Sequence, residues 1–150
     1  MPGTYSQILL HAVFSTKRRA AFIKPQIQSR LCDYIGGIVR AERGTLYAIG
    51  GTADHVHLLL RWRTDGTIAD LMRTVKARSS LWVHKTFTGA AAFAWQEGYA
   101  VFAVSKSAEP DVKRYIESQL DHHKKRDFKE ELLALLRAYG VEFDGRYLFD

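Results

Sequence analysis

Two histidines separated by a single residue, His55 and His57, stand in a strand-like run over residues 54–62. Because side chains along a strand alternate between its two faces, both imidazoles project to one side, together with Leu59 and Arg61. Two imidazoles and a nearby amide oxygen can hold a metal ion. The same pattern also occurs in strands that bind no metal, so the pair by itself leaves a structural role open. The opposite side of the strand carries residues expected in a core: Val56, Leu58, Leu60 and Trp62.

Tyr115 and Gln119 lie four residues apart in a segment with helical periodicity. Residues i and i+4 of a helix lie one above the other, so these two side chains share a face. They are rotated by roughly 100° from the apolar stripe of the predicted helix and therefore sit at its edge. A tyrosine in such a place can act as a nucleophile, although tyrosine and glutamine also decorate many helix surfaces. Together with the histidine pair, they point to phosphodiester chemistry.

The composition is that of a globular protein with an excess of positive charge. The chain of 150 residues suffices for one domain with a full core, and we expect a single domain spanning residues 1–150. Lys and Arg outnumber Asp and Glu by 22 to 16, which favours a polyanionic partner such as nucleic acid. The only cysteine, Cys32, excludes an internal disulfide and a thiolate zinc cluster, and we interpret it as a buried spacer. No signal peptide and no run of about 18 apolar residues is visible, so we expect a cytoplasmic protein that does not engage a membrane.

Apolar periodicity alternates between strand and helix in an order that predicts the fold. Residues 50–53 supply turn chemistry for a hairpin, Thr67 caps one helix with help from Asp70, and Ser107 caps another. The order predicts an α+β fold, a ferredoxin-like antiparallel sheet with helices on one face and a C-terminal helical extension. The other face of the sheet would be left for chemistry. The expected strands are residues 5–14, 45–49, 54–62 and 100–104, and the expected helices begin near residues 25 and 67 and span residues 109–122 and 128–139.

Positive charge is concentrated in the loop after the first strand and along the second helix. The loop contains Lys17, Arg18 and Arg19, and the helix carries cations from Arg73 to Lys85 without an acidic residue among them. A phosphate-binding surface and an ordinary solvated helix face both fit this pattern. Inside the first strand, we interpret His11 as a core or interface histidine rather than a metal ligand.

Short motifs spread over nearly the whole chain resemble those of one family, the single-tyrosine HUH transposases of small insertion sequences and their REP-associated relatives. One position departs from the pattern, since Ala100 stands where a glycine is expected after Gly98 and Tyr99. The likeness is specific because the motifs occur together and in the expected order. They are His55-Val56-His57, Tyr115-Ile116-x-x-Gln119, Phe14-Ser15-Thr16-Lys17, Leu71-Met72-Arg73-x-Val75-Lys76, Trp95-Gln96-x-Gly98-Tyr99, and His122-His123 followed by Phe128-x-x-Glu131.

This resemblance implies an enzyme that cuts single-stranded DNA at the foot of short hairpins and later rejoins the strands. Tyr115 would be the nucleophile, forming a 5′-phosphotyrosine link and leaving a free 3′-hydroxyl. His55, His57 and Gln119 would bind a divalent metal, Mg²⁺ or Mn²⁺. The family's enzymes act as homodimers in which the tyrosine of one subunit completes the site of the other. The DNA would be contacted by Lys17, Arg18, Arg19, Arg73, Lys76 and Arg78, with aromatic stacking possible on unpaired bases.

Two other functions fit parts of the sequence. One is a non-catalytic, domesticated protein that binds hairpins or single strands, whose binding would depend on salt but not on metal or Tyr115. The presence of His55, His57, Tyr115 and Gln119 together argues against it, because a retired enzyme need not keep all of them. The other is a replication initiator or relaxase that uses the same chemistry. The short length of the chain and the single tyrosine in the Tyr115-Ile116-x-x-Gln119 motif argue mildly against it.

Overall fold

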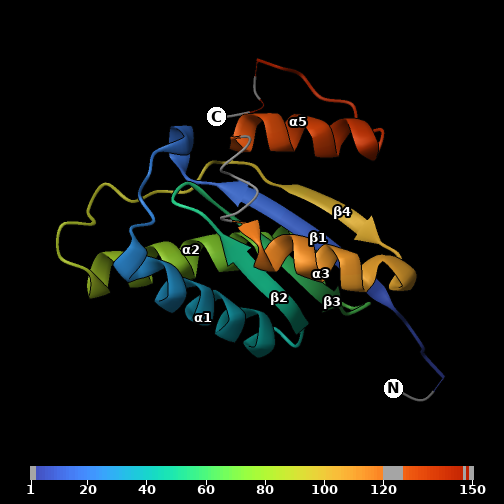
Figure 1. Cartoon of the computed structure of the whole chain (residues 1–150). Helices are drawn as coiled ribbons and strands as arrows, with labels where there is room; N and C mark the ends of the chain where they lie inside the picture. Colours follow the sequence, from blue (N-terminus) through green and yellow to red (C-terminus); the bar gives the residue numbers. More distant parts are fainter. Residues whose placement is uncertain (1–2, 120–126, 147, 149–150) are drawn as a thin grey trace.

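The computed structural model describes residues 3–119, 127–146 and 148. Its centre is a four-stranded antiparallel sheet in the order β2-β3-β1-β4. The strands are β1 (Ile8–Ser15), β2 (Thr45–Gly51), β3 (His55–Trp62) and β4 (Ala100–Val104). The helices are α1 (Pro25–Ala41), α2 (Ile68–Thr86), α3 (Glu109–Glu117) and α5 (Phe128–Ala138), with short 3-10 turns at Lys17–Arg19 and Lys106–Ala108 (Figure 1).

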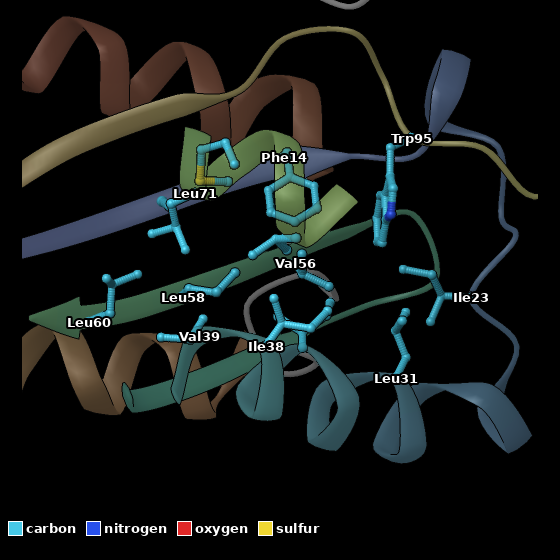
Figure 2. Close-up of a cluster of buried hydrophobic side chains, with 14 of the residues drawn as sticks. Phe14, Ile23, Leu31, Ile38, Val39, Val56, Leu58, Leu60, Leu71 and Trp95 are labelled. Atoms are coloured by element: carbon cyan, nitrogen blue, oxygen red, sulfur yellow. The ribbon is translucent and has the colours of Figure 1, made fainter. Parts of the chain in front are cut away.

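The element order and the strand order together confirm the predicted ferredoxin-like α+β fold. The larger core lies between one face of the sheet and helices α1 and α2. Figure 2 shows this cluster, in which Phe14 and Trp95 pack edge to face with ring centroids 4.8 Å apart. The side of β3 predicted to be apolar supplies Val56, Leu58, Leu60 and Trp62 to this core.

The second face of the sheet is covered as well, contrary to the expectation that it would be left open. There Ile116 of α3 packs on Leu59 and Leu9. Phe128 of α5 joins Val13 of β1 and Phe102 of β4. The covering has a physical reason. The histidine face of β3 also carries Leu59, and burying this apolar side chain stabilises the fold relative to leaving it exposed to water. α3 and α5 therefore bury the middle of the histidine strand instead of exposing it.

Several predicted boundaries are confirmed and others are corrected. The Thr67 side chain accepts a hydrogen bond from the backbone N–H of Asp70, as the capping pattern predicts. Ser107 does not cap α3, since it lies in the preceding 3-10 turn and the N-cap residue is Ala108. α3 ends at Glu117, before the expected end at residue 122. The expected end of that helix and the His122-His123 motif fall outside the described residues.

Gly50 was expected in a turn, but it lies within β2. A Cβ atom at Gly50 would lie 2.3 Å from the backbone oxygen of Ile116, closer than any real Cβ contact. The glycine is therefore needed for the close approach of α3 to β2, and the actual turn falls on the residues after Gly51. Among the described residues, no helix has both the length and the apolar character required to cross a membrane.

Candidate active site

The two histidines of β3 lie at the centre of a buried polar cluster. His55 and His57 are both fully buried, and β3 is hydrogen-bonded to β2 on one side and to β1 on the other. Their Nε2 atoms point toward one carboxylate, Glu131 Oε1, at 3.3 Å from His55 and 2.8 Å from His57. The Oε1 atom of Gln119 lies 3.1 Å from His55 Nε2. The structure thus brings both histidines and Gln119 together, as the sequence predicts.

Glu131 is the central residue of this cluster, and sequence reasoning did not assign it a role. It lies on α5 and is only 1% exposed. The sequence did contain a sign of this role. Glu131 lies on the apolar stripe of that helix, three residues after Phe128 and one before Leu132, where an apolar side chain would be expected. A buried carboxylate is unfavourable unless it is paired and hydrogen-bonded, so its position on this stripe suggests a task beyond packing.

Tyr115 approaches the same carboxylate from α3. Its hydroxyl donates a hydrogen bond to Glu131 Oε2, while Oε1 faces the histidines. The centroid of its ring lies 5.7 Å from that of His57, edge to face. The tyrosine and the histidines belong to the same chain, so one subunit assembles all of these groups.

The outer nitrogens of the two histidines have different partners. Nδ1 of His55 lies 2.7 Å from Asp54 Oδ1 and 3.0 Å from Thr52 Oγ1. Nδ1 of His57 lies 2.7 Å from Nε2 of a third histidine, His11 of β1. The interpretation of His11 as a core histidine is correct as to burial, since it is 2% exposed, but its partner is a residue of the site.

Burial and neighbouring carboxylates act in opposite directions on these imidazoles. Burial alone would lower the pKa of His55, but its hydrogen bonds to Asp54 and Glu131 and their negative charges outweigh burial and raise that pKa to about 9. Burial, followed by the positive charge of a protonated His57, lowers the pKa of His11 to about 3. At neutral pH His11 is therefore uncharged.

The donor set fits a divalent metal ion. Ligand atoms bound about 2.1 Å from one metal, at octahedral or tetrahedral angles, lie roughly 3.0–3.4 Å from one another. The distances of 2.8, 3.3 and 3.1 Å that join His57 and His55 to Glu131, and His55 to Gln119, fall close to this range. Ligand atoms of His55, His57 and Glu131 all lie within 4.8 Å of one another. Mixed imidazole and oxygen donors suit Mn²⁺ well and Mg²⁺ less well.

The six basic residues predicted to contact DNA have different surroundings. Lys17, Arg18 and Arg78 are exposed and Arg19 is half-buried, while exposed Arg73 pairs with Asp70. The Lys17–Arg19 turn directly follows the end of β1 that pairs with His55. Lys76 differs from these five, since its ammonium group is hydrogen-bonded to the backbone of the protein.

The ammonium group of Lys76 binds a loop of the protein. It donates hydrogen bonds to the backbone oxygens of Gln96 (2.8 Å), Glu97 (3.2 Å) and Gly98. Burial lowers the pKa of Lys76 to about 8. The Gln96 side chain in turn accepts a hydrogen bond from the backbone N–H of Ser15, at the end of β1. Lys76 therefore fixes the loop that follows Trp95, a role that its place on a basic helix face did not reveal.

Comparison with known proteins identifies the family. Residues 4–119 match the family model described as "Transposase IS200 like". The chain belongs to this family of transposases. A relative, the ISDra2 transposase TnpA of Deinococcus radiodurans, is 23% identical over 124 residues, which cover 79% of this chain and 89% of the relative.

Two solved structures share the fold of this transposase. The crystal structure of a predicted transposase from Deinococcus radiodurans R1 has a TM-score of 0.61 and 24% identity, covering 79% of this chain and 95% of the other. A REP-associated tyrosine transposase, solved bound to a REP hairpin, has a TM-score of 0.59 and 16% identity and covers 82% of this chain and 73% of its own. The resemblance found in the sequence motifs is thus confirmed at the level of family and fold.

Proposed function

We propose that this member of the IS200-like family is a cytoplasmic, metal-dependent transposase that cleaves and rejoins single-stranded DNA at hairpin ends through a 5′-phosphotyrosine intermediate. The observation that carries the proposal is the meeting of a tyrosine hydroxyl and two imidazole Nε2 atoms on one buried carboxylate. A tyrosine used only for packing does not require a charged partner inside the protein. A nucleophile does require a group that takes its proton.

In this mechanism His55, His57 and Gln119 would hold the divalent cation, Mg²⁺ or Mn²⁺, and Glu131 would add a fourth donor atom. The cation would polarise the scissile phosphate and stabilise negative charge developing on it. Asp54 holds His55 from the outside, so that its Nε2 is directed inward. The burial of the histidines excludes bulk water from their side of the centre.

Tyr115 supplies the attacking oxygen. Its hydroxyl proton passes to Glu131 Oε2, with which it is already hydrogen-bonded, while the phenolic oxygen forms a bond to phosphorus. The bond from phosphorus to the 3′-oxygen breaks, and this oxygen leaves as a hydroxyl by taking up the proton that Tyr115 gave to Glu131, relayed by water. The phosphodiester is conserved as a phosphotyrosine, so the reverse step with another 3′-hydroxyl rejoins the strands without an external source of energy.

We infer that the partner is single-stranded DNA with hairpins. The hairpin in the structure of the REP-associated transposase supports this inference, as do the exposed cations of this chain. Lys17, Arg18 and Arg78 are the leading candidates for phosphate contacts, and Arg19 and Arg73 are further candidates. Lys76 is a weaker candidate because its ammonium binds backbone oxygens.

A homodimer is part of the proposal, following the family. One chain already brings Tyr115 to its own His57, so assembling these groups does not require a second subunit. Sedimentation of the protein with and without hairpin DNA, followed by a cleavage assay on each fraction, tests whether the active species is a dimer.

The test of the function is a covalent one. Single-stranded DNA that carries the hairpins flanking the gene and a label at its 3′ end is incubated with protein and Mn²⁺ or Mg²⁺ and separated on a denaturing gel, because a 5′-phosphotyrosine link retains the 3′ fragment on the protein. We expect a labelled band of protein size that is absent with Tyr115→Phe, with His57→Ala and with EDTA, while Tyr115→Phe still binds the hairpin. Tight hairpin binding by the wild type without any covalent band, in either metal, would instead support the non-catalytic binder.

A further inference from the structure

A third histidine lies directly behind the candidate metal centre. His11 is on β1, where it pairs in register with Leu59 of the neighbouring strand, and its ring stacks on that of His57 with centroids 5.0 Å apart. Phe102 and Tyr115 surround it with centroids at 6.1 and 6.3 Å. These rings hold the imidazole in one place, with Nε2 at 2.7 Å from His57 Nδ1.

The distance between these two nitrogens requires one shared proton. Two imidazole nitrogens at 2.7 Å form a hydrogen bond only when one carries hydrogen and the other offers a lone pair. When a neutral His57 carries its proton on Nε2 and donates it to Glu131, its Nδ1 accepts, so His11 Nε2 is the donor. When His57 Nε2 offers its lone pair to a cation, His57 Nδ1 carries the proton and His11 Nε2 accepts it.

His11 can serve both arrangements because its own second nitrogen, Nδ1, holds the proton in the second one. In these two arrangements each ring keeps one proton, so the pair is neutral in both and only the tautomers differ. A carboxylate, which is the partner of His55, can only accept. His57 therefore has an adaptable partner where His55 has a fixed one.

We propose that His11 is the positioning residue of His57: it pairs with Nδ1 in either tautomer and holds the imidazole so that Nε2 is directed into the metal centre. The inference rests on the proposed function only in taking His57 as a metal ligand. His11 does not touch the metal or the phosphate in this account and acts through His57 alone.

The experiment compares three variants of the full chain, without DNA. His11→Phe keeps the ring and the packing but removes both nitrogens. His11→Gln retains an amide that can accept or donate near the place of Nε2. Leu9→Ala is the control, because Leu9 lies two residues away on the same strand, is equally buried and belongs to a different cluster, with Leu59 and Ile116.

Mn²⁺ affinity, measured by electron paramagnetic resonance of the free ion, is the first readout. We expect His11→Phe to bind Mn²⁺ about 10- to 100-fold more weakly than the wild type, the usual effect of removing the outer partner of a metal-binding histidine. His11→Gln should recover most of the affinity, and Leu9→Ala should retain it despite a loss of stability. The second readout is ¹⁵N NMR of the imidazoles with Mg²⁺, in which the wild-type His57 should carry its proton on Nδ1 alone and His11→Phe should show a mixture.

The outcomes separate this inference from the proposed function. It is overturned if the wild type does not bind Mn²⁺, if His11→Phe binds as tightly as the wild type, or if His11→Gln is as weak as His11→Phe. In the last case ring packing, and not the hydrogen bond, would position His57. If the expected affinities are found but no covalent band forms with DNA, the role of His11 stands and the transposase mechanism fails.

Discussion

Replacing Glu131 by Gln tests the centre of the site without changing its shape. The carboxylate is 1% exposed and faces His57 and His55 through one oxygen and Tyr115 through the other. The amide keeps one acceptor oxygen, but it turns an NH₂ group toward either the imidazoles or the phenol. It also removes the negative charge that faces His55, whose pKa of about 9 makes it a cation at neutral pH.

The expected magnitude follows from burial. Breaking a buried ion pair by removing one partner reduces stability by about 3–5 kcal/mol, because the remaining charge stays without compensation. The amide still fits and Asp54 still pairs with His55, so we expect the lower end, about 3 kcal/mol at pH 7. For a domain of this size, such a loss lowers the melting temperature by roughly 6–12 °C.

Urea denaturation in EDTA measures this loss, and Glu130→Gln is the matched control. Glu130 is the exposed neighbour on the same helix, so its substitution should change the free energy of unfolding by less than about 0.5 kcal/mol. Mn²⁺ at 100 times its dissociation constant should stabilise the wild type by about 2.7 kcal/mol and Glu131→Gln by much less. Equal stabilities of Glu131→Gln and Glu130→Gln in EDTA would refute the reasoning that a charged carboxylate organises the site.

Three further predictions concern pH, packing and DNA. The pKa of His55 is raised from 6.5 to about 9 in the folded protein, so its contribution to stability is fully present below pH 6.5 and is lost as pH rises through 9. Urea denaturation of the metal-free protein should therefore show a free energy of unfolding that declines between these pH values, and an increase would contradict the prediction. Gly50→Ala should lower stability by about 1–3 kcal/mol because its Cβ meets a backbone oxygen of α3, whereas Gly37→Ala, with nothing within 4 Å in the middle of α1, should raise it by roughly 0.5–1 kcal/mol in thermal denaturation. Arg18→Ala should weaken hairpin binding and reduce the slope of log affinity against log salt by about 0.7 if the contact is to a single strand, measured by fluorescence anisotropy; an unchanged slope would exclude this residue from the interface.

Local patterns in the sequence predicted most of the framework. The alternation along residues 54–62 assigned the core side of β3 correctly, since Val56 and Leu58 are buried against α1 and α2. The pairing of Thr67 with Asp70 located the start of α2. These features depend on contacts between near neighbours in the chain, which the sequence shows directly. Their success extends to His55, which lies in β3 as predicted.

Other assignments failed because they depend on packing between distant segments. Gly50 resembled a turn residue, and only the approach of α3 to β2 shows why no side chain fits there. Lys76 belonged to a basic helix face, but the carbonyl oxygens that surround it come from a loop twenty residues away in sequence. The second face of the sheet was expected to be open, and the docking of α3 and α5 covers it.

The sequence by itself therefore determined the family, the antiparallel fold and the candidate residues for metal binding and nucleophilic attack. Each of these depends on residue types at short spacings along the chain. Only the tertiary structure decided how these side chains are charged and held. Glu131 and His11 come from α5 and β1, and each reaches His57 across a separation of 74 and 46 residues respectively. Burial then removes the water that would weaken their interactions, so a buried carboxylate and a core histidine become partners of the histidine strand.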